Sequence, residues 1–297
     1  MKRTFFITCV LFNCFALTTS GQTDSLRQKI KQILSPAKAD IGVAIYGFEN
    51  EDSLSFNGNT HFPMQSVFKF HIALAVLNKT DKEELSLDQK IFIKKSDLVT
   101  RTWSPLQKKY PDGNVSLPLR EIISYMVSQS DNNACDILLR LLGGTLEVDK
   151  YFHDIAINDV SIQASEEEMH KEWNIQFKNW TTPLSGIHLL RKFYDREILS
   201  EKTFNFLWGL MSETSTGKSR IKGELPAGAL VADKTGTSDT NESGVTAAVN
   251  DIGIVTMPNG KHFAICVFVS NSREDNNTNE KIIADIARAA WDYFTLK

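Results

Sequence analysis

A serine followed three residues later by a lysine places a hydroxyl and an amine on one helical face. The 297-residue chain has this spacing four times, at Ser35–Lys38, Ser66–Lys69, Ser215–Lys218 and Ser219–Lys222. Only Ser66–Lys69 stands at the start of a long apolar run, which predicts a hydroxyl near a helix N-terminus and a lysine inside the core. A lysine desolvated there must be paired or neutral, and a neutral amine suits a base. The alternative is a Lys69 that reaches solvent from a core helix.

Two further polar motifs each occur once in the chain. Residues 130–132 (Ser-Asp-Asn) lie between two helical runs, where the same residue types are also ordinary helix N-caps. Residues 234–237 (Lys-Thr-Gly-Thr) follow a strand-like segment, and so short a motif carries little weight alone. Either motif gains significance only if the fold brings it to Ser66 and Lys69.

The elements that would position these motifs follow from hydrophobic periodicity and turn residues. The strand-like segments lie towards both ends of the chain, with a turn at 258–260, and they are 40–48, 52–56, 229–233, 244–257 and 262–270. The helical segments are 24–34, 66–77, 119–127, 133–142, 183–199, 200–211 and 279–294. Segment 161–182 has few aliphatic residues and predicts a long loop.

This order of elements predicts an α/β (α+β) fold. Its antiparallel five-stranded sheet would be assembled from both chain ends and flanked by helices, with an all-α domain inserted between them. The sheet domain would comprise 22–60 and 215–297, and the helical domain would comprise 61–214. The junction of the two domains is the expected place for a site.

The first 21 residues have the pattern of a cleaved export signal. Two basic residues follow the first methionine, residues 4–17 are apolar and residues 18–21 are small. The stretch is too short for a spanning helix, and a buried N-terminal helix is the alternative interpretation. Cys14 could mark a lipoprotein site, although the bulky residues before it fit one poorly. We therefore expect cleavage near residues 20–21 and a periplasmic or secreted mature protein.

Composition narrows the function classes. Hydrophobic residues make up 42% and charged residues 23% of the chain, as in an ordinary globular protein. A net charge of −3 without a basic stripe argues against a nucleic-acid partner. We expect the mature protein to be a monomer that is not attached to the membrane once the signal is removed. The six histidines lack paired ligand spacing, so neither a metal nor a cofactor is predicted. Cys135 and Cys266 should be buried, and whether they bond stays open.

In this order, the motifs at 66–69, 130–132 and 234–236 resemble the active-site elements of penicillin-recognising serine enzymes. The resemblance covers the mature chain and is greatest to class A serine β-lactamases. Residues 61–70 and Met169-His170 are similar to the extended-spectrum and cephalosporinase subgroup of Bacteroidota type. The resemblance implies hydrolysis of the β-lactam amide of penicillins and cephalosporins, including oxyimino-cephalosporins, and hence antibiotic resistance.

The resemblance also assigns the groups that react in acylation. It implies that Ser66 attacks the lactam carbonyl and becomes acylated, with Lys69 as the base or as a proton relay. Ser130 would pass a proton to the leaving lactam nitrogen, and Lys234 would hold Ser130 polarised. Backbone N–H groups of Ser66 and Thr237 would form the oxyanion hole, aimed at the charge that develops on the carbonyl oxygen.

Release of the acyl group needs a water and a general base, which separates a hydrolase from a stalled acyl-enzyme. Three glutamates occupy 166–168, and such a run on a loop ordinarily forms a solvated face. The resemblance selects Glu166 because it stands four residues before His170, which would help to position the water. Most class A members have Asn at that place, so this water must be held differently. Whether Glu166 or Lys69 is the acylation base stays open.

The substrate-binding residues are likewise implied by the resemblance. Asn132 would hydrogen-bond the side-chain amide of the substrate, and Trp103 would form an aromatic wall, with plain core packing as its alternative. Gly244 stands where many members have an arginine, so Arg220 is the expected substitute, with a surface arginine as its alternative. The residues expected to bind the substrate carboxylate are Lys234, Thr235, Gly236 and Thr237.

The loop at 161–182 departs from the family pattern. Ala164 and Asn179 occupy positions where many class A members have an Arg–Asp ion pair that braces this loop. The loop must therefore be held in another way, and we predict a site widened for bulky oxyimino side chains.

Three other classes of protein compete with this interpretation. A DD-peptidase or another penicillin-binding protein would be acylated and stall, and the spacing of Glu166 and His170 argues against it. A non-catalytic β-lactam sensor would signal through a membrane anchor, for which this chain supplies no transmembrane segment. A metallo-hydrolase is disfavoured by the histidine spacing.

Overall fold

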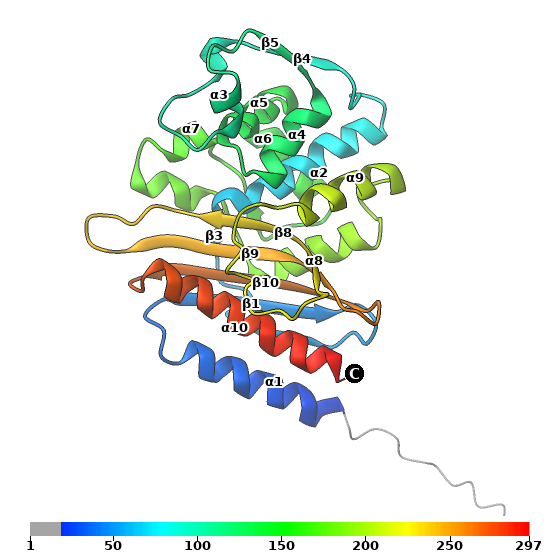
Figure 1. Ribbon diagram of the computed structural model, residues 1–297, viewed down its shortest axis with the longest axis vertical. Coiled ribbons are helices and arrows are strands. Elements are labelled where there is room, and N and C mark those ends of the chain that lie inside the picture. The colour runs from blue at the N-terminus through cyan, green and yellow to red at the C-terminus, as the bar shows by residue number, and fades with distance from the viewer. Residues whose placement is uncertain (1–18, 297) are drawn as a thin grey trace, which may run out of the picture.

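An antiparallel sheet of five strands runs through the middle of the protein. The computed structural model describes residues 19–296 (Figure 1). Neighbouring strands in the sheet are all antiparallel. Their order across the sheet is β2 (Ser53–Phe56), β1 (Asp40–Gly47), β10 (His262–Ser272), β9 (Thr246–Thr256) and β8 (Leu230–Thr237). The predicted fold class, with a sheet built from both ends of the chain, is confirmed.

Strand β1 shows why this sheet is covered on both faces. Ile41, Val43 and Ile45 belong to one buried cluster, whereas Ala44 and Tyr46 belong to another, because successive side chains point to opposite faces. Helices α1 (Thr19–Leu34) and α10 (Asn276–Thr295) pack together over the first face. Helix α8 (Pro183–Tyr194) packs on β1 and β10 from the second face.

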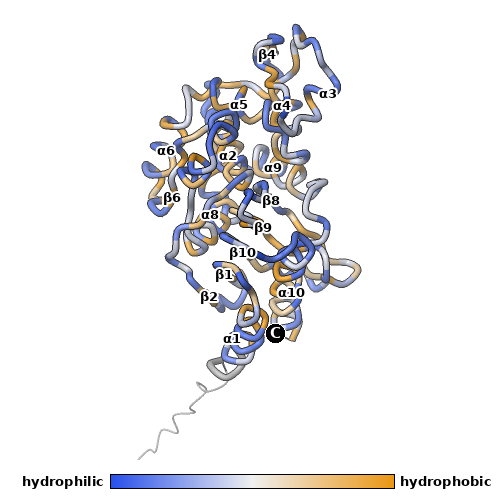
Figure 2. Tube along the Cα trace, turned by 90° about the vertical axis from the view of Figure 1, so that its left-hand side faces the viewer, coloured by the Kyte–Doolittle hydropathy of each residue, from blue (hydrophilic) through white to orange (hydrophobic). Residues whose placement is uncertain are grey.

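A helical region lies on the second face of the sheet, above it in Figure 2. Helix α2 (Phe68–Asp81) runs through the middle of this region, and its residues 68–77 are all buried. A helix buried on every side is apolar all round, which explains the continuous hydrophobic run in its sequence. The helices that pack against α2 are α4 (Leu119–Ser128), α5 (Asn132–Leu142), α6 (Thr145–Asp154) and α9 (Glu201–Ser212).

The main departures from the predicted elements lie in polar segments. The loop predicted at 161–182 contains two short helices, α7 (Glu166–Met169) and η3 (Trp173–Lys178), and β7 (Trp180–Thr181), which pairs with β3 (Phe62–Pro63) and with β6 (Val160–Ser161). Sequence periodicity also missed α6, because it buries only Val148 and Phe152. Three further short elements were not predicted, and they are α3 (Pro105–Lys109) and the paired strands β4 (Lys90–Ile93) and β5 (Val115–Pro118).

The N-terminal prediction falls largely outside the described residues. The predicted export signal covers residues 1–21, and the structure describes only the last three of these. Helix α1 begins at Thr19, whereas the sequence predicts a helix that begins at residue 24. Among the described helices, none combines the length and the apolar character needed to cross a bilayer. Cys135 and Cys266 are both buried and unbonded.

Candidate active site

The nucleophile candidate stands on a tight turn that leads into α2. Ser66 lies in the 3-10 turn η1 (Gln65–Val67), and Lys69 lies in the first turn of α2. Lys69 Nζ donates to Ser66 Oγ over 2.9 Å, as the spacing predicts. The turn can lie against β8 because residue 236 is glycine: a Cβ there would come within 2.3 Å of the Met64 carbonyl oxygen.

Lys69 is fully buried and has several partners. Its Nζ donates to the Ser130 carbonyl at 2.8 Å and to Asn132 Oδ1 at 2.5 Å. It also forms an ion pair with Glu166 Oε1 at 2.9 Å. A buried ammonium ion needs such compensation for the water it has lost. These contacts exclude a Lys69 side chain that extends to solvent. They also bring the 66–69 motif into contact with the 130–132 motif.

The third motif reaches the same place from the sheet. Lys234, on β8, is fully buried and donates from Nζ to Ser130 Oγ and to the Thr235 carbonyl, each at 2.9 Å. Burial first, and the Lys69 ammonium second, lower the pKa of Lys234 to about 7. Ser130 has a left-handed backbone with φ of 56°. Lys234 therefore contacts the hydroxyl of Ser130, which is a candidate proton carrier, while Lys69 contacts the backbone carbonyl of the same residue.

The 130–132 motif divides into capping and site residues. Asp131 caps α5 by accepting from the Ala134 N–H at 2.8 Å, and it also accepts from the Leu106 N–H and the Ser104 hydroxyl. Asn132 instead donates from Nδ2 to Thr102 Oγ1 at 2.7 Å and accepts from Lys69. The capping interpretation thus holds for the middle residue of the motif, and its neighbours face the site.

Glu166 is the buried member of the acidic run. Only 4% of it is exposed, whereas Glu167 and Glu168 are exposed and fit the solvated-face interpretation. Glu166 Oε1 lies 3.5 Å from Ser66 Oγ, so one carboxylate approaches both the nucleophile and the lysine. His170 Nδ1 contacts the Glu166 carbonyl oxygen at 2.6 Å, at the end of α7.

Backbone hydrogen bonds to two side chains hold the 161–182 loop. Asn179 is fully buried, accepts on Oδ1 from the Gln163 and Ala164 N–H groups at 2.8 and 2.9 Å, and donates to the Ala164 carbonyl. Asp136 accepts from the Glu166 N–H at 2.8 Å on Oδ1 and from the Glu167 N–H at 2.9 Å on Oδ2. The Asn179 contacts connect the loop to itself at the two positions where the family's ion pair is missing, and the Asp136 contacts connect the loop to α5.

Sequence reasoning missed Asp136. It stands four residues after Asn132, so both side chains lie on one face of α5, and this spacing was the available signal. Burial, followed by the charge of Glu166, raises the pKa of Asp136 to about 6 against the effect of the backbone N–H donors. Asp136 is therefore a positioning residue for the loop segment that carries Glu166.

Replacing Asp136 by asparagine should loosen this segment. Asparagine has one acceptor atom, so one of the two N–H donors would lose its partner, at a cost of about 1–3 kcal/mol. The free energy of unfolding should fall by about that amount in urea titrations, and deacylation should slow more than acylation. Asp154→Asn, at an exposed position on α6, serves as the matched control. Unchanged stability and an unchanged ratio of the two rates would contradict the role given to Asp136.

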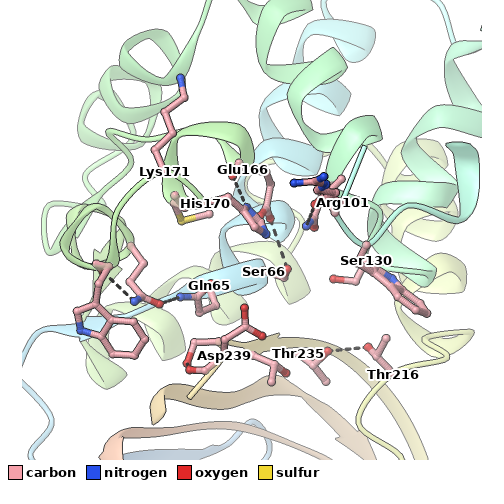
Figure 3. Close-up of a pocket in the computed structure, with 18 of the residues that line it drawn as sticks. Gln65, Ser66, Arg101, Ser130, Glu166, His170, Lys171, Thr216, Thr235 and Asp239 are labelled. Carbon is pink, nitrogen blue, oxygen red and sulfur yellow. Dashed lines mark hydrogen bonds between the residues drawn. The ribbon is translucent and has the colours of Figure 1, made fainter. Parts of the chain in front are cut away.

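A cleft of about 720 Å³ opens over these residues. In Figure 3, Ser66 lies between Glu166 above it and Thr235 below it. Trp103 is 53% exposed, lines the cleft and donates from its indole nitrogen to the Gln129 carbonyl at 2.8 Å. Its aromatic face is therefore a wall of the cleft rather than part of the core.

The floor beside Ser66 contains an amide pair that the sequence did not indicate. Gln65 Nε2 donates to Gln176 Oε1 at 2.5 Å, and Gln176 Nε2 donates to the Trp173 carbonyl at 2.8 Å. Both glutamines line the cleft. This pair connects the nucleophile turn directly to the 161–182 loop.

Arg220 lies beneath the cleft lining. It is 4% exposed, which excludes a surface arginine. Its guanidinium donates to Thr237 Oγ1 at 2.7 Å, to the Gly236 carbonyl at 3.1 Å and to Glu280 at 3.2 Å. Arg220 is thus placed to orient the Thr237 hydroxyl, which itself lines the cleft.

Comparison with known proteins finds relatives that match nearly the whole chain. The model of the Beta-lactamase enzyme family matches residues 25–294. The β-lactamase VEB-1 of Pseudomonas aeruginosa is 47% identical over 300 residues, covering 100% of this chain and 99% of that protein. The crystal structure of the TLA-1 extended-spectrum β-lactamase is 55% identical with a TM-score of 0.90, covering 92% and 99% of the two chains. A class A β-lactamase structure from Bacteroides cellulosilyticus DSM 14838 is 39% identical with a TM-score of 0.89, covering 93% and 99%.

A likeness that extends over nearly the whole chain, in sequence and in fold, defines a hydrolase that opens β-lactams. The chain belongs to the β-lactamase enzyme family, and it is a class A β-lactamase. The predictions of the family and of the enzyme class are confirmed.

Proposed function

We propose that the protein hydrolyses penicillins and cephalosporins, oxyimino-cephalosporins included, through an acyl-enzyme on Ser66 that Glu166 helps to release. The observation that carries this proposal is the chain of contacts around Lys69. Its Nζ lies 2.9 Å from Ser66 Oγ and 2.9 Å from Glu166 Oε1, so a nucleophile, a base and a second acid–base group share one buried point. Such a cluster supplies what a two-step acyl transfer needs.

In the acylation step, Ser66 Oγ attacks the lactam carbonyl carbon. Its proton passes either to Lys69 or to Glu166, and the contact between these two side chains is compatible with either acceptor. Backbone N–H groups of Ser66 and Thr237 are the proposed donors to the oxyanion. As the C–N bond breaks, Ser130 donates its proton to the lactam nitrogen, and Lys234 at 2.9 Å stabilises the Ser130 oxygen.

Substrate binding is assigned to the two sides of the cleft. The substrate carboxylate would lie over β8, against the hydroxyls of Thr235 and Thr237 and beside the ammonium of Lys234. Arg220 would act there through its hydrogen bond to Thr237. On the other side, Asn132 would bind the side-chain amide, with Trp103 packing against the side chain.

The pH dependence of substrate capture follows from Lys234. Its pKa of about 7 means that the ammonium form prevails below pH 7 and the neutral amine above it. Only the ammonium attracts a carboxylate, so kcat/KM should fall as pH rises through about 7, measured between about pH 6 and about pH 9. Lys234→Arg keeps its charge over this range, so its profile should stay level. A level profile in the unsubstituted enzyme would contradict the role of Lys234.

Deacylation is the step that distinguishes this function from that of a penicillin-binding protein. Glu166 would remove a proton from a water that attacks the acyl carbonyl, and His170 would help to fix the water through its contact with the Glu166 backbone. The buried position of Glu166, 3.5 Å from the nucleophile oxygen, favours hydrolysis over a stalled acyl-enzyme.

The range of substrates is inferred from the cleft and from the relatives. The cleft of about 720 Å³ and a loop held without the Arg–Asp ion pair favour bulky oxyimino side chains. The TLA-1 relative is described as an extended-spectrum β-lactamase. We further propose a monomer that is exported to the periplasm and confers β-lactam resistance.

Trapping the intermediate tests this function. The enzyme is mixed with a penicillin, quenched in acid within milliseconds, and its intact mass and peptides are measured. We expect one added penicillin mass, on the peptide that contains Ser66. An adduct on another serine, or a measurable turnover with no adduct at any time, would contradict the assignment.

A further inference from the structure

A second cavity of about 250 Å³ adjoins the catalytic cleft. It lies between the segment 99–102, the first turns of α5 and helix α7. Ser66 lines the cleft and not this cavity, which we call the side chamber. Figure 3 labels three of the residues that line both cavities. The full shared set is Arg101, Thr102, Asn132, Glu166 and His170. The side chamber thus reaches the proposed base without including the nucleophile.

The side chamber extends from an exposed rim to a buried polar floor. Thr100 and Arg101 on the rim are exposed. Asn133, Asp136 and Glu166 on the floor are only 1%, 6% and 4% exposed. A cavity holds water when it has the room and several polar partners, and the side chamber has both.

Hydrogen bonds within the protein fix the positions of the walls of the side chamber. Asn133 Oδ1 accepts from the Val99 N–H at 2.9 Å, and its Nδ2 donates to the Val99 carbonyl at 3.2 Å, which fixes the segment 99–102 to α5. On the opposite wall, Asp136 accepts from the Glu166 N–H at 2.8 Å. The walls of the side chamber are therefore positioned by contacts within the fold.

We propose that the side chamber delivers the hydrolytic water to Glu166 while an acyl group fills the cleft. The inference rests on the proposed acyl-enzyme function. In each deacylation, a water oxygen bonds to the ester carbonyl carbon and its proton passes to Glu166. The bond to Ser66 Oγ then breaks, and the proton is returned to that oxygen. One water is consumed per turnover, and a bulky side chain over the cleft blocks replacement from the front.

Closing the rim tests this route. Thr100 lines the side chamber and not the cleft, so Thr100→Trp narrows the rim without adding bulk to the substrate site. With a bulky oxyimino-cephalosporin, we expect deacylation to slow on the order of ten-fold while acylation is unchanged, so that adduct accumulates at steady state. With 6-aminopenicillanic acid, which leaves the front open, both rates should match those of the unsubstituted enzyme. Ser96→Trp, at a nearby exposed position that lines neither cavity, is the control.

Each other result has a definite meaning. The route would be overturned if Thr100→Trp left deacylation of the bulky substrate unchanged. It would also be overturned if deacylation slowed equally with both substrates, or if acylation slowed as much as deacylation. Should Thr100→Trp fail to show a cooperative thermal transition, Val99→Phe narrows the same chamber and is held to the same outcomes. An unsubstituted enzyme that gives neither turnover nor adduct would instead refute the proposed function itself.

Discussion

Replacing Ser66 by alanine should abolish β-lactam hydrolysis. The substitution removes the oxygen that bonds to the lactam carbonyl, and losses of about 10⁶-fold in kcat are known for nucleophile deletions of this kind. The fold should survive, because Lys69 keeps its ion pair with Glu166 and its bonds to Ser130 and Asn132. Hydrolysis of a chromogenic cephalosporin measures the effect, with intact mass to show that no adduct forms.

Ser35→Ala is the matched control for this prediction. Ser35 has the same spacing to a lysine, but it is exposed and lies outside the cleft. Its substitution should leave hydrolysis and thermal stability unchanged. Residual turnover in Ser66→Ala within about ten-fold of the unsubstituted rate would mean that another group opens the lactam.

Replacing Glu166 by glutamine should separate the two chemical steps. The amide cannot accept a proton from water, and general-base catalysis contributes about 10²–10⁴-fold, so deacylation should slow by that factor. Acylation should survive if Lys69 can act as its base, and an adduct on Ser66 should then accumulate. Single-turnover kinetics combined with intact mass measures both steps.

Glu167→Gln is the control, because that neighbouring side chain is exposed and its Lys171 partner lies 3.8 Å away. It should turn over substrate without accumulating adduct. Rapid turnover by Glu166→Gln would refute Glu166 as the deacylation base. If Glu166→Gln lost acylation as well as deacylation, Glu166 would be the base in both steps. Lys69 would then not be the acylation base.

The residues that react could be predicted from sequence because local geometry links them. Ser66 and Lys69 share a helical face, and 66–77 is apolar enough to predict a buried helix. The sheet was predictable for a similar reason, since β10 contains the continuous apolar run 263–269 and is buried along nearly its whole length. Strand β9 is equally buried, although Asn250 and Asp251 interrupt its apolar residues. The roles of Ser130 and Lys234 required the family resemblance, because 104 residues separate the two side chains that hydrogen-bond.

The supporting contacts could not be predicted because they arise from the tertiary fold. Asp136 is an ordinary helical residue until α7 brings two backbone N–H groups to it. Gln65 and Gln176 meet across 111 residues of sequence. The sequence predicts that Arg220 binds substrate, whereas its burial behind Thr237 depends on where the fold places β8.

The most direct test of the central claim uses the purified mature protein and an oxyimino-cephalosporin. Loss of the lactam chromophore is followed while samples are taken for intact mass. The account predicts many turnovers per enzyme with little adduct at steady state. A stoichiometric, long-lived adduct would contradict deacylation by Glu166 and favour a penicillin-binding or sensor role with Ser66 still acylated. Neither turnover nor adduct, with a simple penicillin also inert, would contradict the assignment of Ser66 as the nucleophile.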